Sequence, residues 1–468
     1  MSILELEIKK ESSDNPEIPD RTKPPKSGTP KDINFPKFFE TKTENGITVL
    51  VIQDNRLPLV TSRFVFKSGA YLDHSSGENK YGLGSITSEL LSKGTLTRTA
   101  TEIAEEVDYI GASLSSGCNY DATYASTYSL KKYFDNIFEI MSDVILNPSF
   151  KEEELDRLKE QRLNSLLSML DDGDYLSDKI FNKYVYGNSP YAFPLEGEKS
   201  SIEKISTDDV RSFYNKIYTP DNLIVAFVGD ITPDEALVKL NSNFSKWNSP
   251  VKEKGKLIIP ELQKSSKVYL TEKRGAVQSS LKIGHLGIRR DNPDFITVNV
   301  MNTMLGGYFT SRINKNLREV NGYTYGARSG FSCNKFAGDF SITTEVKTEI
   351  TSATNIEIIK ELNEIRNNFV GDDELQNVKN YISGNFPMQL ETPNDIASKA
   401  INLKLNDLDD NYYNTYLRKV NEITKEEVKD IAEKYIHADK LTFSIAGNSQ
   451  ALKEEMKQFG DVEIIENV

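Results

Sequence analysis

The pattern of hydrophobic and polar positions predicts alternating strands and helices along the chain. Residues 47–54 and 58–70 are rich in β-branched side chains and end in polar or turn-forming residues, which is typical of strands. Between residues 83 and 91, leucine and isoleucine recur at the spacing of one helix face. Residues 122–130 alternate like a half-buried strand, and the apolar run 223–229 predicts a buried strand. Together these elements indicate an α+β protein.

The second part of the chain repeats the first. Residues 205–230 (ISTDDVRSFYNKIYTPDNLIVAFVGD) align without a gap with residues 423–448 (ITKEEVKDIAEKYIHADKLTFSIAGN), which pairs Gly229 with Gly447 at an offset of 218 residues. A weaker match pairs EEELDRL at 152 with DDELQNV at 372, an offset of 220 residues. Two matches at nearly the same offset favour a tandem duplication of an α+β unit of about 200 residues. The alternative is one common helix–strand motif that occurs twice.

This duplication gives the expected domain organisation. We expect an extended or disordered arm over residues 1–33, because its prolines lie among polar residues. An N-terminal α+β half follows over 34–245, a polar linker over 246–265, and a C-terminal α+β half over 266–468. Each half should hold a mixed or antiparallel sheet with packed helices.

Composition excludes several classes of protein. The chain has 468 residues, 57 Lys and Arg against 70 Asp and Glu, and a net charge of -13. General attraction to nucleic acid or to an anionic membrane is therefore not expected. No stretch approaches the roughly 18 apolar residues of a membrane helix. The two cysteines, Cys118 and Cys333, lie too far apart for a cysteine-rich zinc cluster.

The N-terminal residues do not have the basic and apolar regions of a signal peptide. This predicts a cytoplasmic location, or a periplasmic one if a leader has been removed.

Four segments carry a family resemblance. They are residues 80–95 (KYGLGSITSELLSKGT), 186–197 (YGNSPYAFPLEG), 218–230 (YTPDNLIVAFVGD) and 306–330 (GGYFTSRINKNLREVNGYTYGARSG). The chain resembles the pitrilysin-like zinc peptidases, or inverzincins, which include mitochondrial processing peptidase. The resemblance extends from about Asn34 to the end. It implies two homologous α+β halves, and a clam-shell arrangement with a similar chain around an inner chamber, as in the smaller bacterial members.

The catalytic motif of that family is absent. His-x-x-Glu-His places two zinc ligands one helical turn apart and a glutamate base beside them. The zinc ion lowers the pKa of its bound water, and the base takes the proton. The aligned residues here are Ser85, Ile86, Thr87, Ser88 and Glu89. The third-ligand position falls near Ser165–Leu166, where no carboxylate stands. We therefore expect no metal and no cofactor in this chain, and a zinc ion in a partner subunit.

Other metal sites are weakly indicated. Asp73, His74 and Glu78 lie together in a polar loop, which more commonly is a solvated loop with an incidental histidine. His285 and His437 have no second histidine nearby in the sequence, and each is expected to be a packing or surface residue.

The resemblance assigns a different role to the second half. Active family members contribute an arginine and a tyrosine, seven positions apart, from the half or subunit opposite the zinc. Arg318 and Tyr325 match this spacing within LREVNGYTY. A phenol can stabilise an oxyanion, and a guanidinium can hold a backbone carbonyl. The alternative is that Arg318 caps a helix and Tyr325 opens a core strand. Arg312 is expected to be structural, and Tyr323 is the residue most easily confused with Tyr325.

These observations predict a zinc-free, non-catalytic subunit of a heterodimeric metallopeptidase. It would pair with a homologous chain bearing His-x-x-Glu-His, complete the chamber and supply Arg318 and Tyr325 for cleavage of unfolded peptides. The chain would not be catalytic alone. One alternative is a scaffold subunit resembling the core proteins of the bc1 complex. Another is a non-enzymatic peptide-binding homodimer.

Overall fold

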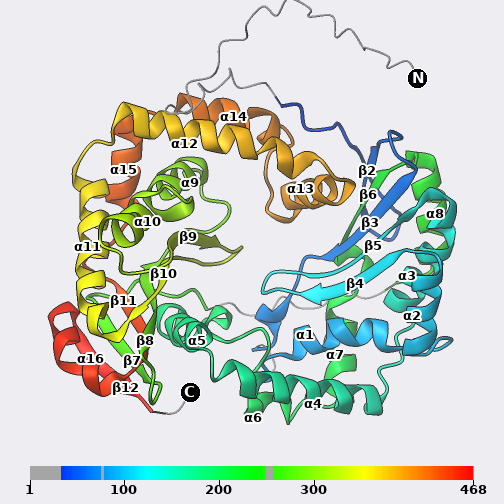
Figure 1. Ribbon diagram of the computed structural model, residues 1–468. Helices are drawn as coiled ribbons and strands as arrows, with labels where there is room; N and C mark the ends of the chain where they lie inside the picture. Colours follow the sequence, from blue (N-terminus) through cyan, green and yellow to red (C-terminus); the bar gives the residue numbers. More distant parts are fainter. Residues whose placement is uncertain (1–32, 75–78, 249–257, 467–468) are drawn as a thin grey trace, which may run out of the picture. The chain divides into compact units, whose positions relative to one another are not determined.

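Two six-stranded mixed sheets organise the protein (Figure 1). The structure is a computed structural model, and it describes residues 33–74, 79–248 and 258–466. The arm predicted over 1–33 therefore lies almost wholly outside the described residues, as does residue range 249–257 of the predicted linker. The described residues from 33 onward belong to one compact unit.

The two sheets share the order and the directions of five strands, and they differ in the outermost one, which pairs antiparallel in the first sheet and parallel in the second. The first sheet runs β1 (Phe39–Lys42), β2 (Thr48–Gln53), β6 (Leu223–Gly229), β3 (Leu59–Phe66), β5 (Thr123–Leu130) and β4 (Ser113–Cys118). The second runs β12 (Asp461–Ile465), β7 (Lys267–Glu272), β11 (Thr442–Gly447), β8 (Gln278–Leu286), β10 (Gly338–Lys347) and β9 (Ala327–Cys333). In each, the second and third strands are parallel, and the strands from the third to the sixth pair antiparallel.

The register confirms the duplication. Gly229 ends β6 opposite Gln53 of the parallel β2, and Gly447 ends β11 opposite Glu272 of the parallel β7. The glycines therefore occupy equivalent strand ends, as the sequence alignment predicts. A Cβ at residue 229 would lie 2.0 Å from the backbone oxygen of Leu59, so only glycine fits there.

The helices follow the same repeat. Those of the first half are α1 (Leu83–Leu90), α2 (Ala100–Tyr109), α3 (Phe134–Leu146), α4 (Glu152–Met169), α5 (Gly173–Tyr186), α6 (Lys199–Ile202), α7 (Thr207–Ile217) and α8 (Pro233–Phe244). Those of the second are α9 (Phe295–Asn302), α10 (Arg312–Asn314), α11 (Thr351–Asn367), α12 (Asp372–Asn385), α13 (Pro393–Leu405), α14 (Tyr412–Glu422), α15 (Lys425–Tyr435) and α16 (Ser449–Met456). Short π-helical turns occupy Thr303–Gly307 and Lys315–Val320.

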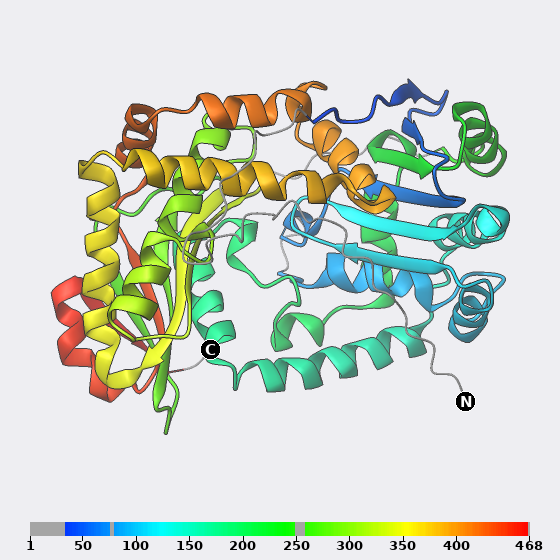
Figure 2. The same ribbon diagram turned by 45° about the horizontal axis from the view of Figure 1, so that its top comes forward.

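Each half lends one helix to the sheet of the other half (Figures 1 and 2). Helix α5 of the first half packs on β8 and β11, where the Ser444 hydroxyl donates to the Ser177 carbonyl at 2.7 Å. Helix α13 of the second half packs on β3 and β6, where the Arg63 guanidinium donates to the Ser398 hydroxyl at 2.5 Å. The two sheets are thus tied together by a reciprocal exchange of equivalent helices.

This exchange explains why the central strands are apolar throughout. All seven residues of β6 are buried. Val225 and Phe227 join the core of the first half, whereas Ile224 and Ala226 join the core that includes α13. Because both faces of the strand are covered, it reads as a continuous apolar run instead of an alternating one.

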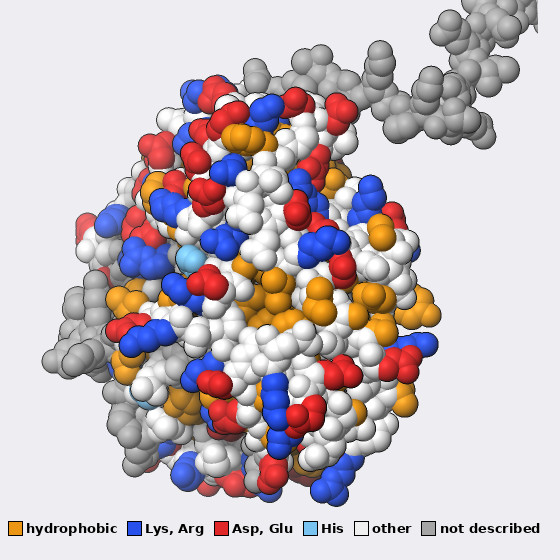
Figure 3. All heavy atoms as spheres, turned by 90° about the vertical axis from the view of Figure 1, so that its left-hand side faces the viewer, with side chains coloured by type: hydrophobic (Ala, Val, Ile, Leu, Met, Phe, Trp, Pro, Cys, Tyr) orange, Lys and Arg blue, Asp and Glu red, His pale blue; other side chains and the backbone are white. Residues whose placement is uncertain are grey.

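Charge is mixed over the surface shown in Figure 3, where Lys, Arg, Asp and Glu side chains are interspersed. Within the described residues, no helix is long and apolar enough to cross a membrane.

Candidate functional site

The loop before α1 anchors the start of that helix. The Asp73 carboxylate is buried and accepts the backbone N–H groups of Gly82 at 3.0 Å and Gly84 at 2.9 Å. Burial raises the pKa of Asp73 to about 8, and the backbone N–H donors oppose that rise. His74 approaches the Tyr81 hydroxyl at 3.3 Å, and Glu78 lies outside the described residues. Asp73 is therefore committed to the backbone of the helix start.

A guanidinium lies where the resemblance would place the zinc ligands. Ser85 and Glu89 are one turn apart on α1, and Arg162 of α4 reaches both. Its Nη1 donates to the Ser85 hydroxyl at 3.2 Å and to the Glu196 carbonyl at 3.3 Å, and its Nη2 forms an ion pair with Glu89. The Arg162 side chain is 10% exposed. The Arg162 guanidinium of α4 thus lies against the positions of α1 that align with the zinc-binding histidines.

Ser88, the position aligned with the catalytic base, lies apart from this cluster. Its hydroxyl is fully buried, donates to the Gly84 carbonyl at 2.8 Å and lies 3.4 Å from the Tyr218 hydroxyl. The structure therefore brings together Ser85 and Glu89 but turns Ser88 toward the core. Among the residues that the structure describes, no group of three or more His, Cys, Asp or Glu side chains could hold a metal ion.

Arg162 is the residue that the sequence analysis missed. It lies three positions before the third-ligand position near Ser165–Leu166, on the same helix. The sequence offered one signal for this residue. Arg162 lies one helical turn from the position where active members have a carboxylate, and Glu89, an acidic residue, replaces the last histidine of the motif.

The two histidines of the second half lie side by side, although they are far apart in the sequence. The rings of His285 and His437 are 4.8 Å apart between centroids. His285 Nδ1 donates to the Leu286 carbonyl at 2.9 Å, and its Nε2 accepts the backbone N–H of His437 at 3.0 Å. Burial lowers the pKa of His285 to about 3. Both ring nitrogens are used within the fold, so His285 is a packing residue.

Arg318 lies in an unusual stretch of backbone. It is held in the π-helical turn Lys315–Val320, a conformation that is rare and often found at functional sites. Its guanidinium carbon is 4.5 Å from the centre of the Phe309 ring, which is 62% exposed. Asn314 fixes the neighbouring backbone, because its amide donates to the Phe309 carbonyl at 2.6 Å and accepts the N–H of Ala327 at 2.9 Å. Hydrogen bonds of the Asn314 side chain thus hold together the backbone on either side of the segment that carries Arg318.

Tyr325 projects away from the core. Its side chain is 96% exposed, and β9 begins two residues later at Ala327. The turn that carries it is anchored by Thr324, whose hydroxyl bonds to the carbonyls of Glu345 at 2.8 Å and Gly326 at 3.0 Å. The alternative in which Tyr325 opens a core strand is therefore wrong.

Neighbours of the pair have structural roles. Arg312 forms two hydrogen bonds with the Glu374 carboxylate, at 2.6 and 2.7 Å, and this partner raises the pKa of Arg312. The expectation that Arg312 is structural is confirmed. Tyr323 is partly buried and packs against the core of the second half.

The fold and the altered α1 motif define a protein of the zinc-peptidase class that lacks the zinc-binding residues. Two family models match the chain: "Insulinase (Peptidase family M16)" over residues 48–189, and "Peptidase M16 inactive domain" over residues 204–382. The chain belongs to peptidase family M16, the pitrilysin-like group that its motifs resemble.

Similar proteins carry both peptidase and non-peptidase names. The "Non-peptidase homolog YmxG" of Helicobacter pylori is 26% identical over 86% of this chain and 92% of its own length. The "Uncharacterized zinc protease YmxG" of Bacillus subtilis is 24% identical over 68% of this chain and 76% of its own length.

Among solved structures, a peptidase M16 inactive domain from Pseudomonas fluorescens is similar, with a TM-score of 0.82, 27% identity, and coverage of 88% of this chain and 98% of the other. The periplasmic protease PqqL of Escherichia coli shares the fold, with a TM-score of 0.72 and 14% identity over 94% of this chain and 52% of PqqL. The α+β architecture of two homologous halves is therefore confirmed.

Proposed function

We propose that this chain is the zinc-free, non-catalytic subunit of a heterodimeric metallopeptidase. Its partner would be a homologous chain bearing His-x-x-Glu-His and the zinc ion. Arg318 and Tyr325 would be supplied to the partner's active site, where unfolded peptides are cleaved. The domain limits 34–245 and 266–468 belong to this proposal, with the second half carrying the Arg318–Tyr325 pair.

The observation that carries the proposal is the exposure of Tyr325. A tyrosine that is 96% exposed contributes little to a hydrophobic core, yet Thr324 anchors its turn with hydrogen bonds to two carbonyls. Arg318 lies in the same segment, stacked on an exposed phenylalanine. This is the chemistry expected of groups that hold a substrate carbonyl and an oxyanion on a second molecule.

The sheet edges support a role in binding extended peptides. β4 ends the first sheet and β9 ends the second, each paired on one side with its neighbouring strand. A peptide that adds to β9 would use main-chain hydrogen bonds and would pass close to Tyr325, which precedes the strand by two residues. Strand addition reads the backbone more than the sequence, which suits substrates of varied sequence.

Copurification of the native protein from its source tests the proposal. We expect a homologous His-x-x-Glu-His chain in a one-to-one complex that contains about one zinc ion and has chelator-sensitive peptidase activity. The isolated chain should contain no stoichiometric zinc and should cleave no peptide. A chain that purifies alone and still contains one zinc ion with peptidase activity would overturn the proposal.

A second function is favoured by one comparison. The Helicobacter pylori relative is named a non-peptidase homolog, which suits a peptide-binding protein without an enzyme partner. Recovery of a homodimer that binds unfolded peptides, with no zinc-bearing chain, would support that function.

A further inference from the structure

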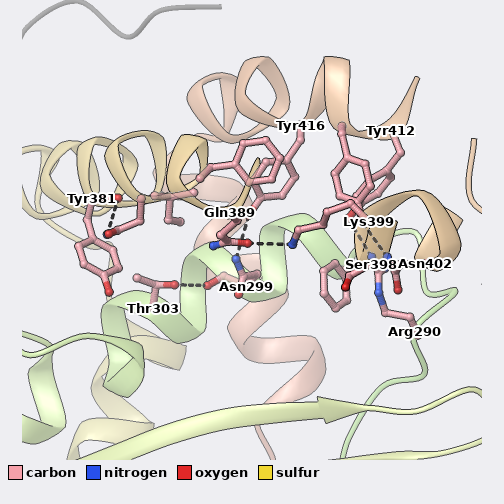
Figure 4. Close-up of a pocket in the computed structure, with 15 residues that line it drawn as sticks. Arg290, Asn299, Thr303, Tyr381, Gln389, Ser398, Lys399, Asn402, Tyr412 and Tyr416 are labelled. Atoms are coloured by element: carbon pink, nitrogen blue, oxygen red, sulfur yellow. Dashed lines mark hydrogen bonds between the residues drawn. The ribbon is translucent and has the colours of Figure 1, made fainter. Parts of the chain in front are cut away.

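A cavity of about 570 Å³ lies between helices α9, α12, α13 and α14 of the second half (Figure 4). Its size falls within the usual range of small-molecule sites. Rings from four tyrosines and two phenylalanines form much of the wall, with side-chain amides between them. Two cations, Arg290 and Lys399, line the cavity, and none of the lining residues is Asp or Glu.

Arg290 is held between aromatic rings. Its guanidinium carbon lies 3.9 Å from the centre of the Phe295 ring and 5.3 Å from that of Tyr412. Its Nη2 is 3.5 Å from the Tyr412 hydroxyl, a long and weak contact. Stacking fixes the plane of the guanidinium and leaves N–H groups at its edge for an in-plane acceptor.

Lys399 enters the same cavity from α13. Its ammonium group donates to the Gln389 side-chain oxygen at 2.8 Å and lies 5.6 Å from the centre of the Tyr413 ring. Burial lowers the pKa of Lys399, and the charge of Arg290 lowers it further, while Asp395 acts in the opposite direction. The Asp395 carboxylate accepts the Thr392 hydroxyl, and the Asp395 backbone N–H donates to the oxygen of that hydroxyl at the start of α13.

Within the described ranges, neither cation forms an ion pair, although the chain as a whole carries a net charge of -13. Two like charges close together in a partly dry cavity disfavour each other, and a bound anion removes that cost. Arginine presents a planar fork that matches a carboxylate, and the surrounding rings suit a flat or apolar body.

The geometry points to a binding site, in this cavity, for a carboxylate carried on an aromatic or apolar body, gripped by Arg290 and Lys399. The carboxylate can come from a free small acid or from the C-terminus of a peptide. Both sources present the same chemistry to the two cations. The lining of this cavity includes neither Arg318 nor Tyr325 and comes wholly from this chain, so the site can be tested separately from the proposed function.

Binding to the isolated full-length chain, measured by calorimetry and ligand-observed NMR, tests this site. The probes are N-acetyl-phenylalanine, a hexapeptide ending in phenylalanine with a free carboxylate, and the same hexapeptide as its C-terminal amide. The hexapeptide acid should bind at least about tenfold more tightly than the amide, since a charge-assisted hydrogen bond is lost. Binding of N-acetyl-phenylalanine as well identifies a small acid as sufficient, whereas binding of the hexapeptide acid alone identifies a peptide C-terminus.

Variants locate the binding. Lys399→Gln and, separately, Arg290→Gln should each weaken acid binding by at least about tenfold. Lys419→Gln removes an exposed cation from α14 and should leave affinity unchanged. Far-UV circular dichroism and thermal unfolding check that each variant is folded, and the acid–amide comparison on the unaltered chain needs no variant.

Three results would overturn the inference. They are equal affinity for acid and amide, no binding of either acid up to millimolar concentration, and binding that Lys399→Gln leaves unchanged. Tighter binding of inorganic phosphate than of either acid would also overturn the assignment to a carboxylate.

Discussion

The guanidinium of Arg162 pairs with the carboxylate of Glu89 on the helix that holds the zinc motif in active M16 peptidases. Glu89 stands at the last position of that motif, where the active enzymes have a histidine. The helix positions that align with the two zinc-binding histidines therefore contact a cation from the protein itself. If the two histidines alone were restored, a bound zinc ion would lie close to the Arg162 guanidinium, and the two positive charges would repel each other.

This leads to a prediction about zinc affinity. The double variant Ser85→His/Glu89→His should bind zinc poorly, because the Arg162 charge repels the ion and no carboxylate stands at the third-ligand position near Ser165–Leu166. Adding Arg162→Ala should raise zinc affinity by at least about tenfold, as expected from removing a nearby unit charge. Competition with a chromogenic chelator measures the affinities. Adding Arg157→Ala, which removes an exposed arginine of the same helix, serves as the control.

Equal zinc affinity with and without Arg162 would show that the guanidinium does not control the site.

The second prediction concerns the pair in the reconstituted heterodimer. Tyr325→Phe removes one hydroxyl donor and keeps the ring. Loss of an oxyanion donor typically lowers kcat by about 10²–10³-fold, or about 2.7–4 kcal/mol. Arg318→Lys keeps the charge but loses the planar fork, and should also lower kcat. Turnover, complex formation and zinc content are measured together.

Tyr323→Phe is the matched control, because Tyr323 packs against the core. Unchanged turnover in an intact Tyr325→Phe complex would assign the segment a structural role instead.

The third prediction concerns the dependence of stability on pH. The pKa of His285 is lowered from 6.5 to about 3 in the folded chain. At pH values between these two pKa values, His285 is therefore protonated in the unfolded chain and neutral in the folded chain. The contribution of His285 to the free energy of unfolding is fully present above pH 6.5. It decreases as the pH falls toward 3, by up to about 1.4 kcal/mol per pH unit.

Urea unfolding at several pH values, compared between the unaltered chain and His285→Gln, measures this contribution. The raised pKa of Asp73 gives the opposite slope between about pH 4 and 8, but it is present in both proteins and cancels in the difference. An identical slope in His285→Gln would contradict the assigned pKa.

The fourth prediction follows from the exchange of α5 and α13. Cleavage at a protease site placed within residues 249–257 should leave the two fragments associated. Each fragment made alone should fail to unfold cooperatively, because one face of its sheet would lack the covering helix. Size-exclusion chromatography and thermal unfolding report the result. Fragments that separate and each remain folded would refute it.

Much of the fold follows from the sequence because it depends on local periodicity and on the repeat. The strand predicted at 223–229 has those bounds in the structure. Gly229 and Gly447, which the sequence alignment matches, lie at equivalent strand ends in the two sheets. The predicted strand 58–70 is shorter in the structure and ends at Phe66, because the chain bends at Lys67 and enters a short 3-10 turn at Ala70. These are short-range effects that residue type controls.

The site was less predictable because it depends on contacts between distant segments. The loss of the zinc ligands could be read from residues 85–89, but the approach of Arg162 requires the packing of α4 on α1. The proximity of His285 to His437 likewise arises from the pairing of β8 with β11. Spacing within one segment carries no information about such contacts.

The helix exchange also has a consequence for how the protein is made. The sheet of the first half is complete in strands once Gly229 has been synthesised, yet the helix that covers it, α13, begins only at Pro393. More than 160 further residues must therefore leave the ribosome before that apolar face is shielded from water. During this interval the nascent chain exposes a strand surface of the kind that aggregates or recruits chaperones.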